Sequence, residues 1–134
     1  AATDYCLATK FASIKLSELS IGIGPFVIEP AVSRKIGVTA MSQMTIDAEQ
    51  FFSAEFAKEK GLYADIFETT EALDKAINTL AEKLAGYNHE ALKEMKKVFW
   101  NGTSHWNDLL NERAEISGKL VLSTFTKEIL RRFK

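Results

Sequence analysis

The apolar positions along the chain fall into two patterns. Up to about residue 67 they form short runs without a helical period, which predict strands over residues 5–9 and 12–16 and a strand or extended segment over 62–67. From residue 70 onwards, apolar side chains recur every three or four positions, as in Leu73, Ile77, Leu80 and Leu84. The sequence therefore predicts a small amount of strand followed by a helix-rich C-terminal part.

Glycine, proline and capping residues set the expected boundaries of these elements. Residues 21–25 combine two glycines with a proline and predict a loop. N-caps are expected at Ser53, Thr70 and Asn88, and helix ends at Gly37, Gly61, Gly86 and Gly102. The predicted helices are 30–36, 38–44, 53–60, 70–86, 88–102, one from Trp106 that is interrupted near 117–118, and a last one carrying Val121, Leu122, Phe125, Ile129 and Phe133.

The amphipathic helices need a surface on which to bury their apolar sides. Two short strands offer little sheet, because stable sheets usually have three or more strands. The architecture therefore looks like the second half of a larger domain, with residues 1–67 as part of a core and residues 68–134 as a helical region.

Composition excludes several classes of function. Seventeen Lys and Arg stand against eighteen Asp and Glu, so the net charge of −1 gives no electrostatic reason to bind nucleic acid or an anionic membrane. The longest uncharged apolar stretch, residues 21–28, is far shorter than the roughly 20 residues of a membrane-spanning helix. The single cysteine, Cys6, cannot form an internal disulfide, and no signal peptide is visible, so we expect a cytoplasmic protein.

Few residues stand out as candidates for chemistry. His89 and His105 have no second ligand at metal-binding spacing, and Cys6 has no nearby histidine, so structural roles are favoured for all three. Motifs for phosphate, dinucleotide, zinc or serine-hydrolase chemistry are absent from the sequence. Glu18 differs because it lies between a predicted strand and the loop at residues 21–25, where a backbone can approach a ligand closely.

Five segments in order resemble the enoyl-CoA hydratase/isomerase (crotonase) family. They are Asp-Tyr-Cys-Leu-Ala at 4–8, Lys-Phe-Ala-Ser-Ile-Lys-Leu-Ser-Glu at 10–18, Leu-Ser-Ile-Gly-Ile-Gly-Pro at 19–25, Arg-Lys-Ile-Gly at 34–37 and Ser-Ala-Glu-Phe-Ala-Lys-Glu-Lys-Gly-Leu at 53–62. Each segment is weak alone, but their order and spacing agree with the family. The resemblance covers nearly the whole chain.

The resemblance implies an α/β crotonase (ClpP/crotonase-like) fold, of which this chain would be the C-terminal portion. In this family two backbone N–H groups hold the oxygen of an acyl-CoA thioester and stabilise the enolate that forms. Glu18 matches the second of the two glutamates that transfer protons when water is added or removed. The family implies no metal and no redox cofactor, since coenzyme A is part of the substrate.

The resemblance also indicates substrate-binding positions. Gly22, Pro25 and Phe26 follow the candidate glutamate, and Phe125 matches an aromatic residue of the family's last helix, which lies near the adenine of CoA. Two departures affect these assignments. The usual glycine-rich stretch is replaced by Phe-Val-Ile-Glu-Pro at 26–30, and Glu128 stands where the family usually has lysine.

The family's Gly-Gly-Gly-x-Glu segment would fall immediately before Ala1, so we expect the chain alone to be inactive. Family members assemble as trimers or hexamers through the helical tail, where this chain carries Trp106, Leu109, Leu110, Val121, Leu122 and Phe125. A role in fatty acid metabolism follows from the resemblance. Two alternatives remain open: a crotonase-fold isomerase or decarboxylase that uses one carboxylate, and a non-catalytic helical association module.

Overall fold

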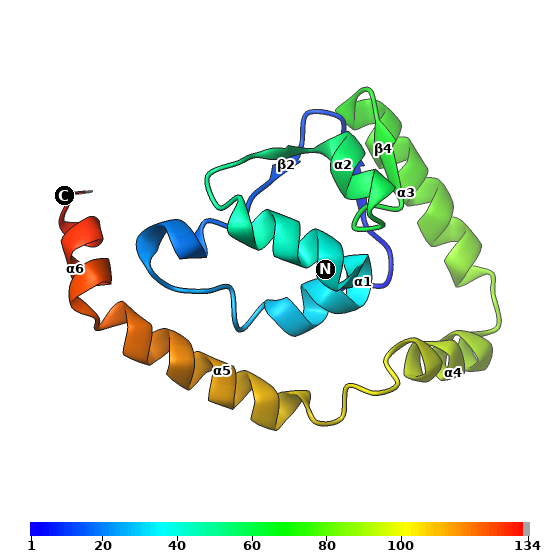
Figure 1. The fold of residues 1–134 in the computed structure, drawn as a ribbon. Coiled ribbons are helices and arrows are strands. Elements are labelled where there is room, and N and C mark those ends of the chain that lie inside the picture. Colours follow the sequence, from blue (N-terminus) through cyan, green and yellow to red (C-terminus); the bar gives the residue numbers. More distant parts are fainter. Residues whose placement is uncertain (133–134) are drawn as a thin grey trace.

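The computed structural model describes residues 1–132, which form a small mixed core and a long helical arm (Figure 1). The core comes from the first half of the chain. Helices α3 to α6 then run in succession around the outside of the core, and α6 returns to the blue turn that contains residues 18–21. The predicted order, with short strands first and helices after, is therefore confirmed.

Two small sheets tie the core together. Strand β1 (Leu7–Thr9) pairs in parallel with β4 (Asp65–Phe67), and β2 (Ser13–Ile14) pairs antiparallel with β3 (Phe52–Ser53). The strands are shorter than predicted because only the residues that face a partner strand make ladder hydrogen bonds. Strand β3 was not predicted, since two residues are too few to show a period.

Helix α1 (Glu29–Ile46) carries most of the core and is broken at Gly37. Gly37 has φ 78° and ψ 158°, which only glycine adopts without strain, so the predicted break is confirmed although the helical bounds are wider. On either side of it, Val32, Met41 and Met44 pack in one cluster with Leu16 and Phe52. Each buried side chain of this size contributes about 1.5–3 kcal/mol to folding.

The short helix α2 (Ala54–Glu59) is bounded as predicted. The Oγ of Ser53 accepts a hydrogen bond from the backbone N–H of Phe56 at 3.2 Å, and Gly61 follows the helix with φ 83°. Ala54 and Ala57 are fully buried, and these small side chains let α2 pack closely on the strands. This capped helix leads the chain into β4.

Two N-cap predictions for the helical arm have different outcomes. Helix α3 (Thr70–Ala85) is capped by Thr69, whose Oγ1 accepts from the N–H of Ala72, so the prediction of Thr70 is wrong by one residue. Helix α4 (His89–Phe99) is capped by Asn88 as predicted. It ends three residues before Gly102, which lies in the following turn.

Helix α5 (Trp106–Val121) runs through Ser117 and Gly118, so the predicted interruption is wrong. The Ser117 hydroxyl donates to the carbonyl of Arg113 one turn earlier, and Gly118 is not among the glycines with positive φ, so both residues keep helical geometry. Helix α6 (Thr124–Arg131) begins at the Ser123 cap. Val121 ends α5 and Leu122 is its C-cap, so the prediction that both belong to the last helix is wrong. Phe133, which was also assigned to that helix, lies outside the described residues.

The arm leaves much of its apolar surface exposed. Within residues 1–132, no residue of α3, α4 or α5 is buried, and Leu84, Met95 and Phe99 are 40%, 44% and 53% exposed. The same described residues contain no helix that combines the length and apolar character needed to span a membrane. The division at residues 67 and 68 stays a prediction.

Candidate functional site

Glu18 begins the 3-10 helix η1 (Glu18–Ile21), directly before the glycine-containing loop. Its backbone carbonyl accepts hydrogen bonds from the N–H groups of Gly22 and Ile23, and the Ser20 hydroxyl donates to the carbonyl of Ser17 at 2.7 Å. These bonds close a tight turn in which Gly22 has φ 84°. Glu18 therefore lies on a well-fixed turn rather than in an open loop.

The side chain of Glu18 is half-buried, and its two carboxylate oxygens differ in their surroundings. Oε2 is fully shielded from solvent and has no hydrogen-bond partner among residues 1–132. A buried carboxylate oxygen without a partner is costly, and a catalytic role or a group bound from outside is among the explanations for such an atom in a native protein. The geometry thus marks Glu18 as a candidate functional residue.

Helix α6 reaches this turn from the far end of the chain. Gly22 faces Phe125 and Thr126 so closely that a Cβ built on it would lie 2.5 Å from Cδ1 of Phe125 and 2.6 Å from Oγ1 of Thr126. Thr126 is fully buried, whereas Phe125 is 60% exposed. The fold thus brings together Glu18, Gly22 and Phe125, three residues that the sequence analysis selected separately. Their roles stay predictions.

Pro25 and Phe26 line a neighbouring cavity of about 290 Å³ between α1 and α5. The carboxylate of Glu29 also lines it, accepting a hydrogen bond from the Ser33 hydroxyl at 2.6 Å and lying 3.9 Å from the guanidinium of Arg113. The lining of this cavity, taken over residues 1–132, does not include Glu18. Sequence analysis gave Glu29 no partner, because Arg113 is far away in the sequence.

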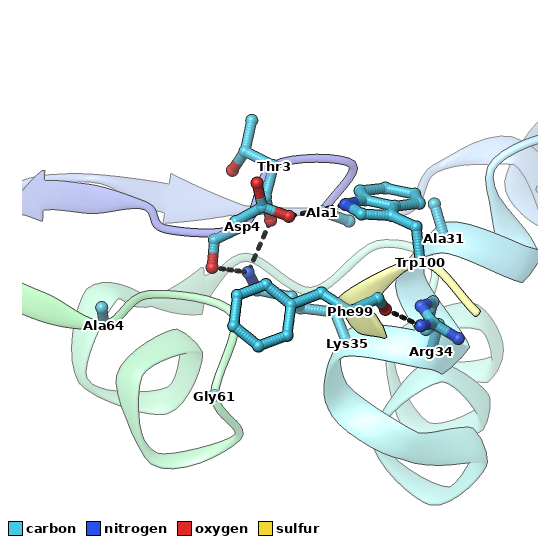
Figure 2. Close-up of a pocket in the computed structure, with 10 residues that line it drawn as sticks. All are labelled: Ala1, Thr3, Asp4, Ala31, Arg34, Lys35, Gly61, Ala64, Phe99 and Trp100. Carbon is cyan, nitrogen blue, oxygen red and sulfur yellow. Dashed lines mark hydrogen bonds between the residues drawn. The ribbon is translucent and has the colours of Figure 1, made fainter. Parts of the chain in front are cut away.

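A larger cleft of about 620 Å³ lies between the N-terminal residues, α1 and the end of α4 (Figure 2). Figure 2 shows Asp4 directed at the indole of Trp100, whose Nε1 donates to it at 2.6 Å, and Arg34 directed at the backbone carbonyl of Phe99. Lys35 donates to the carbonyls of Thr3 and Asp4. These polar groups are occupied with one another, so this cleft fastens the arm to the core and is a weaker candidate site than Glu18.

Asp4, Lys96 and Trp100 form what we call the α4 latch. The Lys96 ammonium donates to the carboxylate of Asp4 and also lies 5.1 Å from the centre of the Trp100 ring. The hydrogen bond from Lys96, followed by the one from Trp100, lowers the pKa of Asp4 below its ordinary value of 3.8. The latch therefore holds α4 with a charged carboxylate at neutral pH.

The remaining candidates from the sequence lie apart from the Glu18 turn. His89 starts α4, His105 precedes α5, and both are exposed. Cys6 is a free, half-buried thiol ahead of β1. Over the described part of the chain, no group of three or more His, Cys, Asp or Glu side chains could hold a metal ion.

Comparison with known proteins identifies the family. A family model described as enoyl-CoA hydratase/isomerase matches residues 1–132. The chain belongs to this family. Among curated proteins, none matches the sequence significantly.

Solved structures agree with this family in fold. An enoyl-CoA hydratase from Bacillus halodurans is 21% identical, with a TM-score of 0.88 over 98% of this chain and 53% of its own. One from Mycobacterium avium is 26% identical, with the same TM-score over 98% of this chain and 51% of its own. An enoyl-CoA hydratase/isomerase from Pseudoalteromonas atlantica is 18% identical, with a TM-score of 0.86 over 97% and 52%.

The predicted family and crotonase fold are thus confirmed. The chain spans about half the length of the solved enoyl-CoA hydratases it matches. The exposed apolar sides of the arm are consistent with this, because they are surfaces that a larger fold would cover.

The sequence did not point to Thr126, the residue of α6 that lies against the Glu18 turn. Thr126 carried no motif, and its complete burial depends on α6 docking onto η1 about a hundred residues earlier in the sequence. The local signal was only the Ser123 cap, whose Oγ accepts from the N–H of Thr126. That signal gives the start of the helix but does not show which face is buried.

Proposed function

We propose that this chain contributes Glu18 as the proton-transferring carboxylate of an enoyl-CoA hydratase/isomerase that acts on an acyl-CoA thioester. The reaction is the addition or removal of water through an oxyanion-stabilised enolate. The observation that carries the proposal is the shielded Oε2 of Glu18, which lies on a fixed turn and has no partner among residues 1–132. Membership of the family supplies the class of reaction.

A carboxylate at this position suits the chemistry. Proton transfer at the α-carbon of a thioester, or at the attacking water, needs a base that is held still and partly removed from solvent. The turn of η1 holds the backbone of Glu18, and the shielded Oε2 has no hydrogen bond within residues 1–132 that would compete with a substrate proton. Gly22, Pro25, Phe26 and Phe125 are the proposed substrate-binding residues around it.

Two backbone N–H groups that bind the thioester oxygen complete the proposed mechanism. The family resemblance assigns these donors, and the first glutamate, to sequence outside residues 1–134. The 134-residue chain is therefore expected to show no turnover by itself. We further propose that the complete enzyme is a cytoplasmic homotrimer or hexamer of fatty acid metabolism that needs no metal or redox cofactor.

The direct test uses the protein expressed from its natural reading frame and a short-chain 2-enoyl-CoA such as crotonyl-CoA. A hydratase converts it to the 3-hydroxyacyl-CoA, with loss of the ultraviolet absorbance of the conjugated thioester. An isomerase instead moves a 3-enoyl double bond into conjugation, and a decarboxylase releases carbon dioxide. Absence of all three activities from a folded protein would favour the non-catalytic association module.

The reading frame upstream of Ala1 offers an independent check. A Gly-Gly-Gly-x-Glu segment there would support the hydratase, because it would supply an oxyanion donor and the first glutamate. A glycine-rich segment without the glutamate would favour the isomerase or decarboxylase. An ordinary start codon directly before Ala1 would favour the association module.

A further inference from the structure

The turn that carries Glu18 is in direct contact with α6 at one point. Gly22 closes η1, and Phe125 and Thr126 occupy the space that a side chain on Gly22 would fill. A Cβ there would meet the Phe125 ring at 2.5 and 2.9 Å and the Thr126 hydroxyl at 2.6 Å, well inside contact distance. Only a glycine allows the helix to come this near.

Thr126 is the centre of this contact. It is fully buried, which sets it apart from the exposed residues on either side of it in α6. Its Oγ1 accepts a hydrogen bond from the Ser123 hydroxyl at 3.1 Å, and its backbone N–H donates to the same hydroxyl at 3.2 Å. These two bonds tie Thr126 to the N-cap of α6 and hold its hydroxyl next to Gly22.

The same contact reaches Glu18 through the backbone. The N–H of Gly22 bonds the carbonyls of Glu18 and Leu19, and the N–H of Ile23 bonds the carbonyl of Glu18 at 3.0 Å. A shift of Gly22 therefore moves Glu18. The Glu18 side chain itself, with Oε2 unpartnered among residues 1–132, has no hydrogen bond at that oxygen to correct such a shift.

We propose that Phe125 and Thr126 form a clamp, the α6 clamp, which sets the position of the Glu18 carboxylate through Gly22. Thr126 is then a positioning residue, since it acts on the reaction through Glu18 and not on the substrate. This inference rests on the proposed role of Glu18. It gives the C-terminal helix a part in proton transfer that is separate from any contact of Phe125 with coenzyme A.

The test compares Thr126→Ala with Thr124→Ala, a matched control on the exposed side of the same helix. The protein expressed from its natural reading frame is assayed with crotonyl-CoA after circular dichroism has shown that each variant folds. Thr126→Ala should lower kcat at least about tenfold while KM stays within about twofold, because small displacements of a catalytic group cost rate more than binding. Thr124→Ala should leave both constants unchanged, and Thr126→Ser should restore most of kcat.

A double-mutant cycle separates positioning from a general structural role. In the Glu18→Gln background, Thr126→Ala should change kcat by less than about twofold, because the group that the clamp positions is already disabled. An equal loss in both backgrounds would overturn the clamp. If Thr126→Ala fails to fold, Thr126→Val keeps the shape, removes the oxygen next to Gly22, and is expected to act in the same direction.

The outcomes also distinguish failure of the clamp proposal from failure of the proposed role of Glu18 in proton transfer. If Glu18→Gln is silent, the role of Glu18 is wrong and the clamp fails with it. If Glu18→Gln is inactive while Thr126→Ala matches Thr124→Ala, only the clamp is wrong. Gly22→Ala approaches the same contact from the opposite side and should reproduce the effect of Thr126→Ala on kcat.

Discussion

The helical arm predicts that the 134-residue chain associates with itself. The accessible surface of the chain is 9051 Å², whereas a compact monomer of this mass exposes about 7000 Å². Roughly 2000 Å² per chain is therefore in excess, more than twice the ~800 Å² per partner that a standard protein–protein interface buries. The helices α3, α4 and α5 account for much of it, because none of their residues is buried and large apolar side chains such as Ile77, Met95 and Phe99 are exposed.

The size of the effect follows from this excess. If about 55–60% of the excess is apolar, roughly 1100–1200 Å² of apolar surface per chain is open to burial between copies. Covering even part of the arm therefore reaches the area of a stable interface, although area alone does not set the affinity. We expect association at micromolar concentrations.

Sedimentation velocity from low to high micromolar concentration measures this association. Leu92→Glu, on the apolar side of α4 where Leu92 is 36% exposed, should shift the distribution toward the 15.0 kDa monomer. Lys93→Ala is the matched control, since it changes the net charge by the same −1 on the polar side of the helix. A wild-type chain that stays monomeric at every concentration, with native helical content, would refute the reasoning.

Three further predictions concern the latch, the assembly and a cap. Asp4→Asn should lower the protection of the α4 amides against hydrogen exchange. Because the latch lowers the pKa of Asp4 below 3.8, wild type should lose the same protection as the pH falls below 3.8 through that lowered pKa; unchanged protection factors in both cases would exclude the latch. Leu110→Gln with Leu122→Gln should shift the protein expressed from its natural reading frame toward smaller species in sedimentation; an unchanged assembly with the fold intact would reject an interface there. Ser53→Ala should cost about 1 kcal/mol of unfolding free energy in urea titrations, and no loss would mean that the cap is dispensable.

Local chemistry decided the parts of the fold that the sequence predicted well. Gly37 and Gly61 take positive φ values, and Ser53 and Asn88 cap helices, because each of these needs only the residue and its near neighbours. Where two neighbouring residues were equally suited, local reasoning failed. Thr69 and Thr70 both make good N-caps, and the structure selects Thr69.

Long-range contacts decided what the sequence did not predict. Strand β3 exists because β2 pairs with it, and α5 continues through Gly118, because a single glycine within a helix weakens it without ending it. At the candidate site, a family motif was enough to select Glu18 and Gly22. Thr126 has no motif, since its burial arises only when α6 docks on a turn near the other end of the chain.

The central claim is that Glu18 transfers a proton, and the most direct test is Glu18→Gln in the protein expressed from its natural reading frame. Glutamine keeps the size of the side chain but cannot accept or deliver a proton at neutral pH. We expect kcat to fall by about 10²–10⁴-fold, which corresponds to an activation barrier raised by roughly 3–5 kcal/mol. The Kd for an acyl-CoA should stay nearly unchanged. Glu29→Gln, which alters a carboxylate paired with Ser33 and Arg113, is the control and should affect kcat far less. A Glu18→Gln enzyme with wild-type kcat, or a Glu29→Gln enzyme that alone loses activity, would contradict the assignment.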